Sequence, residues 1–231
     1  MKRSYQTIKD KKSIKFIQFI TVFIFTIAWT YIIERYMYIN EYLISLDDAE
    51  KNIIGIILQY MIINIPFLIV FILSLRKGLK LYWSFPDTKI RRFSIILLIT
   101  VYLILLFYGF GIIGNKVRTI FFCFFYLCFV SLCEEFLFRG FMPALLDGTM
   151  PKWLVWIIPN LLFSLVHFTA LFVTGEGFSD LSAGEVLYVI FSFTFFGIVM
   201  EFLKRCGCSI WIPILAHAIY DFYAEITMWI E

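Results

Sequence analysis

The sequence predicts an all-α protein that spans a membrane about seven times. Of its 231 residues, 61% are hydrophobic and only 16% are charged, and the mean hydropathy is +0.88. Soluble domains average about 45–50% apolar and about 25% charged residues, and a chain of this size has too little interior to bury the excess. The composition therefore excludes a soluble or disordered chain and predicts an integral membrane protein.

Seven apolar segments support this number of helices, because crossing the hydrocarbon core of a bilayer takes about 20 mostly apolar residues. In order along the chain, the predicted helices cover residues 16–33, 53–75, 93–114, 119–141, 153–173, 186–203 and 209–230. A basic stretch precedes the first segment, as in a signal peptide. The bulky residues that follow it offer no small-residue cleavage site, so we expect a retained helix.

The connections are short, so residues 1–231 are predicted to form a single membrane domain. The first three helices, within residues 1–115, are plain hydrophobic segments. Residues 119–231 hold nearly all the ionisable side chains that fall inside predicted helices. The functional residues are therefore expected in this second part of the chain.

The basic residues predict the orientation, since Lys and Arg gather in the cytoplasmic loops of membrane proteins. Six precede the first helix, and six more lie between the second and third, at positions 76–92. On the same side fall Arg139, Lys152, Lys204 and Arg205, and the other side holds only Arg35, Lys51, Lys116 and Arg118. The N-terminus is thus predicted in the cytoplasm and the C-terminus across a cell membrane. Nucleic acid is not expected as a partner, because the basic residues do not form one soluble face.

The fourth predicted helix contains three charged residues, Glu134, Glu135 and Arg139. A charge at the centre of a membrane helix costs about 2.5–3.5 kcal/mol on insertion scales, which makes such residues functional candidates. Glu135 and Arg139 are four apart with the acid first, a spacing that favours an ion pair on one helical face. Glu134 points about 100° away from that face and lacks this partner.

The chain has only two histidines, His167 and His217, and both fall inside predicted helices. Asp221 follows His217 by four residues and therefore lies on the same helical face. Counting about 1.5 Å per residue from the cytoplasmic end of each segment puts His217 about 12 Å deep and His167 about 21 Å deep. Despite this mismatch, the pairing of two imidazoles with intramembrane carboxylates indicates one shared polar site.

Two structural explanations compete with a functional site. The charged residues of the fourth helix could extend to the cytoplasmic surface, which suits Arg139 better than the shorter glutamates. A single histidine in an apolar helix is also more often a packing residue. If the site is functional, its imidazoles and buried carboxylates can act as general acids and bases, or they can bind a divalent metal ion.

The motifs of other intramembrane enzymes are absent. There is no His-Glu-x-x-His of a zinc protease, too few histidines for a di-iron His-box enzyme, no Gly-x-Ser-Gly, and no Gly-x-Gly-Asp after the Tyr220-Asp221 pair. The five cysteines form no Cys-x-x-Cys pair, which argues against a disulfide framework or a cysteine zinc site.

Three motifs resemble those of a known family. They are Glu134-Glu135-x-x-x-Arg139-Gly140, Phe163-x-x-x-His167, and Ser209-Ile210-Trp211-x-Pro213-Ile214-Leu215-x-His217-Ala218-x-x-Asp221. In order and spacing they are similar to the motifs of the CAAX prenyl protease and bacteriocin-processing family, the Abi group of intramembrane glutamate endopeptidases. The resemblance covers about residues 133–222 and makes residues 119–231 the expected catalytic core.

The resemblance implies a helical bundle with a polar cavity open toward the cytoplasm, and it implies roles for the motif residues. Glu134 would activate the water that attacks a peptide carbonyl, His167 would position that water, and His217 would stabilise the oxyanion. Glu135 and Arg139 would be supporting residues. The family's third motif commonly ends in Asn, so Asp221 is a departure, because an ionised carboxylate donates no hydrogen bond. Asp221 would orient His217, stay protonated, or mark weakened activity.

The sequence thus predicts an endopeptidase that cleaves a membrane-associated peptide or protein within the lipid bilayer. Heavy use of Ile, Phe, Lys, Tyr and Asn suggests an AT-rich coding sequence and a bacterial member, of the peptide-processing or bacteriocin-immunity type. The alternative is a non-catalytic membrane regulatory or immunity protein that acts by binding through its helices. A proton-coupled transporter is a third class, disfavoured because no internal repeat is evident. We predict no cofactor and leave a divalent metal open.

Overall fold

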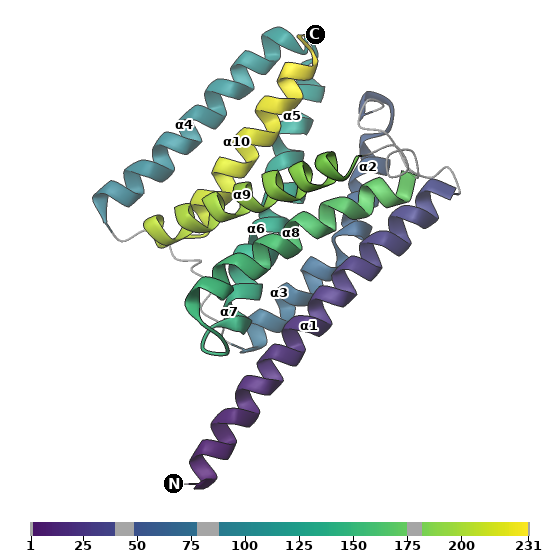
Figure 1. The fold of residues 1–231 in the computed structure, drawn as a ribbon. Helices are drawn as coiled ribbons and strands as arrows, with labels where there is room; N and C mark the ends of the chain where they lie inside the picture. Colours follow the sequence, from purple (N-terminus) through teal and green to yellow (C-terminus); the bar gives the residue numbers. More distant parts are fainter. Residues whose placement is uncertain (1, 40–48, 78–87, 175–181, 231) are drawn as a thin grey trace.

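The computed structural model describes residues 2–39, 49–77, 88–174 and 182–230, and throughout these residues the regular structure is helical, without strands (Figure 1). The helices are α1 (Lys2–Ile39), α2 (Ala49–Ile63), α3 (Ile65–Lys77), α4 (Lys89–Ile112), α5 (Lys116–Phe125), α6 (Leu132–Glu135), α7 (Met142–Leu146), α8 (Lys152–Thr174), α9 (Ala183–Gly207) and α10 (Trp211–Met228). Two π-helical turns, η2 (Tyr126–Ser131) and η3 (Phe136–Phe141), flank α6. The predicted all-α class is confirmed.

The predicted count of seven crossings is not confirmed. All seven predicted segments are helical, but only four described helices are long and apolar enough to cross a membrane: Lys12–Ile39, Lys89–Ile112, Lys116–Leu146 and Ala183–Gly207. α2 and α3 are bent by 53° relative to each other, and they add a fifth crossing if the pair forms one broken span. In α8, only Lys152–His167 qualifies, as a shorter apolar helix.

The bend between α2 and α3 has a local cause in Pro66. Proline has no backbone N–H, so it cannot donate to the carbonyl of Ile62, four residues earlier. The indole Nε1 of Trp29 on α1 donates to that Ile62 carbonyl instead, at 3.0 Å. At the break itself, Asn64 Nδ2 donates to the carbonyl of Phe129 in η2, also at 3.0 Å. The bend is thus held from both sides, by α1 and by the fourth predicted segment.

Polar residues at the helix ends explain several boundaries. Thr88 and Asn115 cap the N-termini of α4 and α5 by accepting from the backbone N–H groups of Arg91 and Arg118. Ser182 and Glu185 form a reciprocal capping box at the start of α9. Between α4 and α5, Gly114 adopts φ +71°, a left-handed conformation that glycine tolerates without strain.

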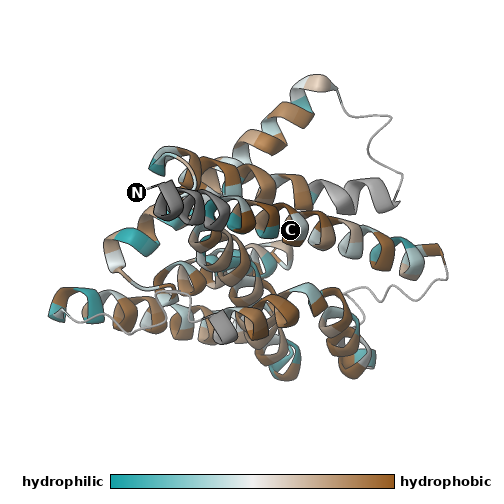
Figure 2. Ribbon diagram, turned by 90° about the horizontal axis from the view of Figure 1, so that it is seen from below, coloured by the Kyte–Doolittle hydropathy of each residue, from teal (hydrophilic) through white to brown (hydrophobic). Residues whose placement is uncertain are grey.

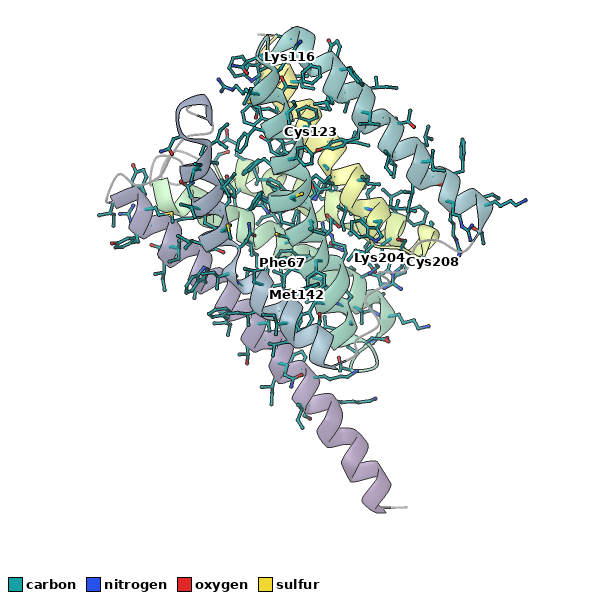
Figure 3. The ribbon with its side chains drawn as sticks, turned by 180° about the vertical axis from the view of Figure 1, so that it is seen from behind. Phe67, Lys116, Cys123, Met142, Lys204 and Cys208 are labelled. Carbon is teal, nitrogen blue, oxygen red and sulfur yellow. The ribbon has the colours of Figure 1, made fainter. Side chains whose placement is uncertain are left out.

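The continuous segment from α5 to α7 forms the centre of the bundle. Half of its most apolar 18-residue window is buried, against 17% in the three other long apolar helices. Phe136, Phe141 and Met142 are fully buried in one core cluster with Phe163 of α8, and Phe67 of α3 packs against it (Figure 3). A second cluster joins η2 and α5 to α10. Large apolar side chains are exposed on the outer helices, and these surfaces suit contact with lipid. Figure 2 shows that hydrophobic residues predominate along the helices.

Candidate active site

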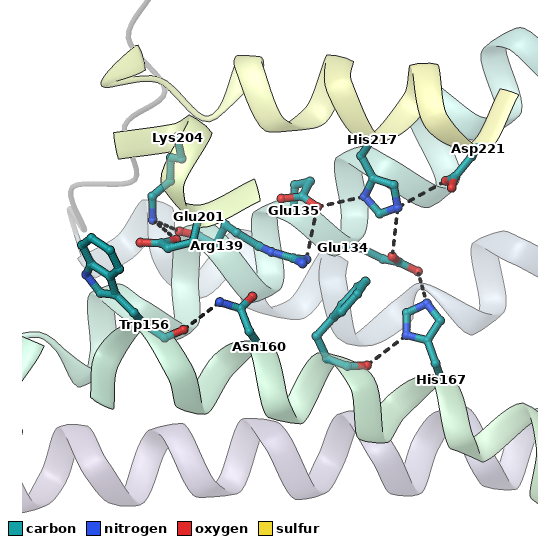
Figure 4. Close-up of polar contacts among 11 residues, drawn as sticks. Glu134, Glu135, Arg139, Trp156, Asn160, His167, Glu201, Lys204, His217 and Asp221 are labelled. Carbon is teal, nitrogen blue, oxygen red and sulfur yellow. Dashed lines mark hydrogen bonds and ion pairs between the residues drawn. The ribbon is translucent and has the colours of Figure 1, made fainter. Parts of the chain in front are cut away.

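Glu134 and Glu135 lie on α6, a single helical turn between two π-helical turns. A π-helical turn contains an extra residue compared with an α-helical turn, and such turns are frequent at functional sites. The two neighbouring glutamates leave this turn in different directions (Figure 4). Glu135 is completely buried, whereas the Glu134 side chain is 28% exposed and lines a cavity.

Glu135 is bound on two sides. Its Oε1 lies 3.1 Å from Arg139 Nη1, so the ion pair predicted from the four-residue spacing is present. The same oxygen accepts a hydrogen bond from Nδ1 of His217 on α10, at 2.8 Å. Glu135 therefore joins the first motif to the third, a contact across 82 residues of sequence.

The suggestion that Arg139 extends to the membrane surface is wrong. Its side chain is 0% exposed, and its guanidinium lies over the ring of Phe163, with Cζ 4.1 Å from the ring centroid. Arg139 is thus held between an anionic partner and an aromatic face inside the bundle, where its charge is compensated.

Glu134 lies between the two histidines. Its Oε1 is 4.0 Å from Nε2 of His167, and its Oε2 is 3.8 Å from Nε2 of His217. Nδ1 of His167 lies 2.9 Å from the carbonyl oxygen of Phe163, which can only accept, so this nitrogen donates. In the neutral ring, Nε2 of His167 is then the acceptor, and it faces Glu134. Both histidines reach the same carboxylate, so the difference in depth counted from the sequence does not keep them apart.

Asp221 completes the group of predicted residues. Its Oδ2 lies 3.3 Å from Nε2 of His217, as the four-residue spacing predicted. His217 therefore has carboxylates on three sides, from Glu134, Glu135 and Asp221. The edge of the His217 ring faces Phe196, and Phe193 stacks on His167, so aromatic side chains hold both imidazoles in place. The structure brings all six predicted site residues together.

A cavity of about 390 Å³ adjoins Glu134, His167 and Asp221. Its apolar lining is contributed by residues of α2, α3, α5, η2, η3 and α8. Its remaining polar lining residues are Thr26, Thr30, Glu34, Tyr60, Asn64, Tyr126 and Cys133. This volume and lining are typical of a site for a mostly apolar ligand with a few polar groups.

A second buried polar cluster supports the first, and sequence reasoning did not identify it. Glu201 and Lys204 of α9 are 1% and 3% exposed, and their side chains pair at 2.6 Å. The ammonium of Lys204 also donates to the backbone carbonyl of Arg139. Arg205 pairs with Glu201 and lies over the ring of Trp156. In the sequence, these pairs were indicated only by spacing: Lys204 follows Glu201 by three residues and Arg205 follows it by four.

Gly197 makes room for this polar interior. A Cβ atom there would lie 2.4 Å from Asn160 Oδ1 and 2.8 Å from Arg139 Nη2, and Asn160 is 1% exposed. Gly197→Ala is therefore expected to lower the free energy of unfolding by about 1–3 kcal/mol, measured by thermal or denaturant unfolding in detergent. The matched control is Gly111→Ala on α4, where a Cβ meets nothing within 4 Å. Equal stability of the two variants would contradict this packing.

Among the described residues, no group of three His, Cys, Asp or Glu side chains has the geometry to hold a metal ion. The arrangement instead offers a carboxylate between two imidazole nitrogens at the wall of a cavity. Such a group can bind and deprotonate a water molecule and stabilise a negative charge that develops beside it.

The comparison with protein families agrees with the motifs. The family model described as type II CAAX prenyl endopeptidase Rce1-like matches residues 116–223, which include every predicted site residue. Comparisons with curated proteins and with solved structures give no match. Over residues 116–223, the chain is therefore similar to the Rce1-like type II CAAX prenyl endopeptidases.

Proposed function

We propose that the protein is an intramembrane endopeptidase that hydrolyses a peptide bond with water activated by Glu134. The observation that carries this proposal is the position of Glu134, whose two carboxylate oxygens each face an imidazole Nε2 at 4.0 and 3.8 Å beside the cavity. These separations are too long for direct hydrogen bonds. They suit a water molecule that bridges the carboxylate and an imidazole.

In the proposed reaction, Glu134 takes a proton from this water while Nε2 of His167 holds it by accepting its second hydrogen. The water oxygen bonds to the peptide carbonyl carbon, and the carbonyl oxygen becomes an oxyanion. Glu134 then gives its proton to the leaving nitrogen as the C–N bond breaks. The products are a carboxylic acid and an amine, and Glu134 is again a carboxylate. The acid product then loses its proton to the amine or to water.

His217 is the proposed partner of the oxyanion. Carboxylates on three sides favour its doubly protonated ring, which donates through Nδ1 to Glu135 and through Nε2 toward Asp221. A fixed positive charge next to the reacting carbonyl stabilises the tetrahedral intermediate more than it stabilises the substrate. Glu135 and Asp221 are then positioning residues that hold the His217 ring.

Asp221→Asn is expected to retain cleavage, because its amide keeps an oxygen that can accept from Nε2 of His217, which lies 3.3 Å from Asp221 Oδ2. Asp221→Leu has a similar shape but no acceptor, and it is expected to lower kcat by about tenfold, the loss of one hydrogen bond to a charged group. Steady-state kinetics of the two variants measures this difference. Equal rates for Leu and wild type would remove Asp221 from the mechanism, and an inactive Asn variant would contradict the expectation that a neutral oxygen is enough beside His217.

The proposed setting is a bacterial plasma membrane with the N-terminus in the cytoplasm. The excess of basic residues in segments assigned to the cytoplasmic side supports this orientation. The proposed substrate is a membrane-associated peptide or protein of the peptide-processing or bacteriocin-immunity type, and the apolar cavity wall supports an apolar segment as the ligand.

The test is turnover by purified protein in detergent with a panel of membrane peptides, with product masses read by mass spectrometry. We expect new termini that require Glu134, with and without a chelator, since the proposed chemistry uses no metal. The alternative is a non-catalytic regulatory or immunity protein, and Asp221 in place of the family's usual Asn favours it. Biological function that survives substitution of both Glu134 and His167 would support that alternative and overturn the enzyme.

A further inference from the structure

The cavity wall formed by α1 carries a polar stripe. Thr26, Thr30 and Glu34 recur every four residues, so they lie on one face of α1, and all three line the cavity. Thr26 and Thr30 are 6% and 8% exposed. The Thr26 hydroxyl donates to the carbonyl of Val22 within the helix, at 2.8 Å, which leaves its lone pairs able to accept from a ligand. Polar side chains at these positions do not follow from packing α1 against apolar neighbours.

Glu34 is the most unusual member of this stripe. One of its carboxylate oxygens is buried and has no hydrogen-bond partner among the described residues. A carboxylate inside a membrane segment is costly unless a partner compensates it. No Lys or Arg is among the cavity-lining residues within the described part of the chain. Among the described residues, an anionic group thus lies at the cavity with no basic side chain lining the wall beside it.

The surroundings of Glu34 continue toward the catalytic residues. Tyr60 of α2 lines the same cavity as Glu34 and Glu134. Aromatic rings of Phe67, Phe125 and Phe129 form other parts of the same wall. Carboxylates and aromatic faces together are the groups that bind cationic side chains.

The two sides of the cavity also differ in their relation to the family. Glu134, His167 and Asp221 fall inside residues 116–223, whereas α1, α2 and α3 fall outside the matched region. The reactive groups are thus part of the shared family core, and the stripe on α1 belongs to the part of the chain that the family model does not match. Residues on α1 can therefore determine which substrate binds without being part of the matched region that holds the reactive groups.

We propose that Glu34, with Thr30, forms a substrate subsite that binds a Lys or Arg side chain of the membrane peptide. The inference rests on the proposed peptidase function, because it assigns the substrate class to the same cavity. Glu34 is here a specificity-determining residue with no part in the chemical steps. The basic side chain supplies the counter-charge, and its alkyl stem contacts the apolar wall.

The experiment uses an apolar host peptide in which a single Lys or a single Met replaces each position around the cleaved bond in turn. Met matches the length of Lys without its charge. We expect wild-type protein to prefer Lys over Met at one position by about 10- to 100-fold in kcat/KM, the range for a hydrogen bond to a charged group. Glu34→Gln keeps the shape of the side chain, and we expect it to bring this ratio close to one.

Two further variants make the result specific. Glu34→Lys should reverse the preference toward a peptide with Glu at that position. Glu185→Gln, an exposed capping residue of α9 away from the cavity, should keep the wild-type ratio. A Lys preference that persists in Glu34→Gln, or no position at which wild type separates Lys from Met, would overturn the subsite.

A binding measurement separates this inference from the proposed function. Labelled Lys and Met peptides are titrated against Glu134→Gln protein and against the Glu134→Gln, Glu34→Gln double variant. Tighter Lys binding that requires Glu34 supports the subsite even where no peptide is cleaved, a result that would count against the peptidase alone. Glu134-dependent cleavage without Glu34-dependent binding would overturn the subsite alone.

Discussion

Replacing Glu134 with glutamine is expected to abolish peptide cleavage while the protein still accumulates in the membrane. Glutamine has the shape of glutamate but cannot take a proton from water. A positioned general base contributes about 10²- to 10⁴-fold to a rate. The loss should therefore appear in kcat, measured from product formation at saturating peptide.

The structure also indicates why this change should leave the fold intact. The Glu134 side chain is 28% exposed, and its ion-pair distances to His167 and His217, 4.0 and 3.8 Å, are too long to anchor a helix. We therefore expect the unfolding midpoint of Glu134→Gln to stay close to that of wild type. Glu185→Gln, at the exposed start of α9, is the matched control and should keep full activity. Cleavage at the wild-type rate by Glu134→Gln would remove Glu134 from the mechanism.

The parts of the site that depend on helical periodicity could be predicted from the sequence. The four-residue spacings from Glu135 to Arg139 and from His217 to Asp221 gave the correct neighbours, at 3.1 and 3.3 Å. Such pairs follow from the geometry of a single helix and need no knowledge of tertiary structure. Helical periodicity also predicted that the side chains of Glu134 and Glu135 point in different directions, about 100° apart.

Contacts between helices could not be predicted in the same way. The hydrogen bond from His217 to Glu135 joins α10 to α6, and the donation from Lys204 to Arg139 joins α9 to η3. Both depend on the crossing of helices, which hydropathy does not encode. Counting residues gave the two histidines different depths because it assumed that α8 and α10 begin at one level. In Figure 1, α8 begins nearer the N-terminal end of α1 than α10 does.

The count of seven crossings is not confirmed for a related reason. Hydropathy treats residues 53–75 as one apolar segment, yet α2 and α3 are bent by 53° at the break beside Pro66, and within α8 only Lys152–His167 qualifies, as a shorter apolar helix. Apolar composition identifies segments that can lie in a membrane, but it does not show whether a segment forms one straight helix across it.

Arg139→Met is expected to cause the largest loss of stability among the changes considered. Arg139 and Glu135 are both 0% exposed, and breaking a buried ion pair costs about 3–5 kcal/mol. Glu135 keeps the hydrogen bond from His217 at 2.8 Å, so we expect the lower end of this range. Methionine fills part of the volume but offers no charge to Glu135. The measurement is unfolding in detergent, followed by the loss of helical circular dichroism. The control is Arg205→Met. Arg205 is 36% exposed, and without it Glu201 would still form its ion pair with Lys204. We expect a smaller loss there.

A double variant separates the structural part of this pair from its effect on the reaction. In Glu135→Gln with Arg139→Met, both buried charges are removed, so much of the lost stability should return. Activity should not return, because glutamine gives His217 a neutral partner in place of the carboxylate that accepts from Nδ1 at 2.8 Å. A stable double variant with wild-type kcat would show that Glu135 matters only for packing. A stable and slow one would show that the charge beside Arg139 acts through His217.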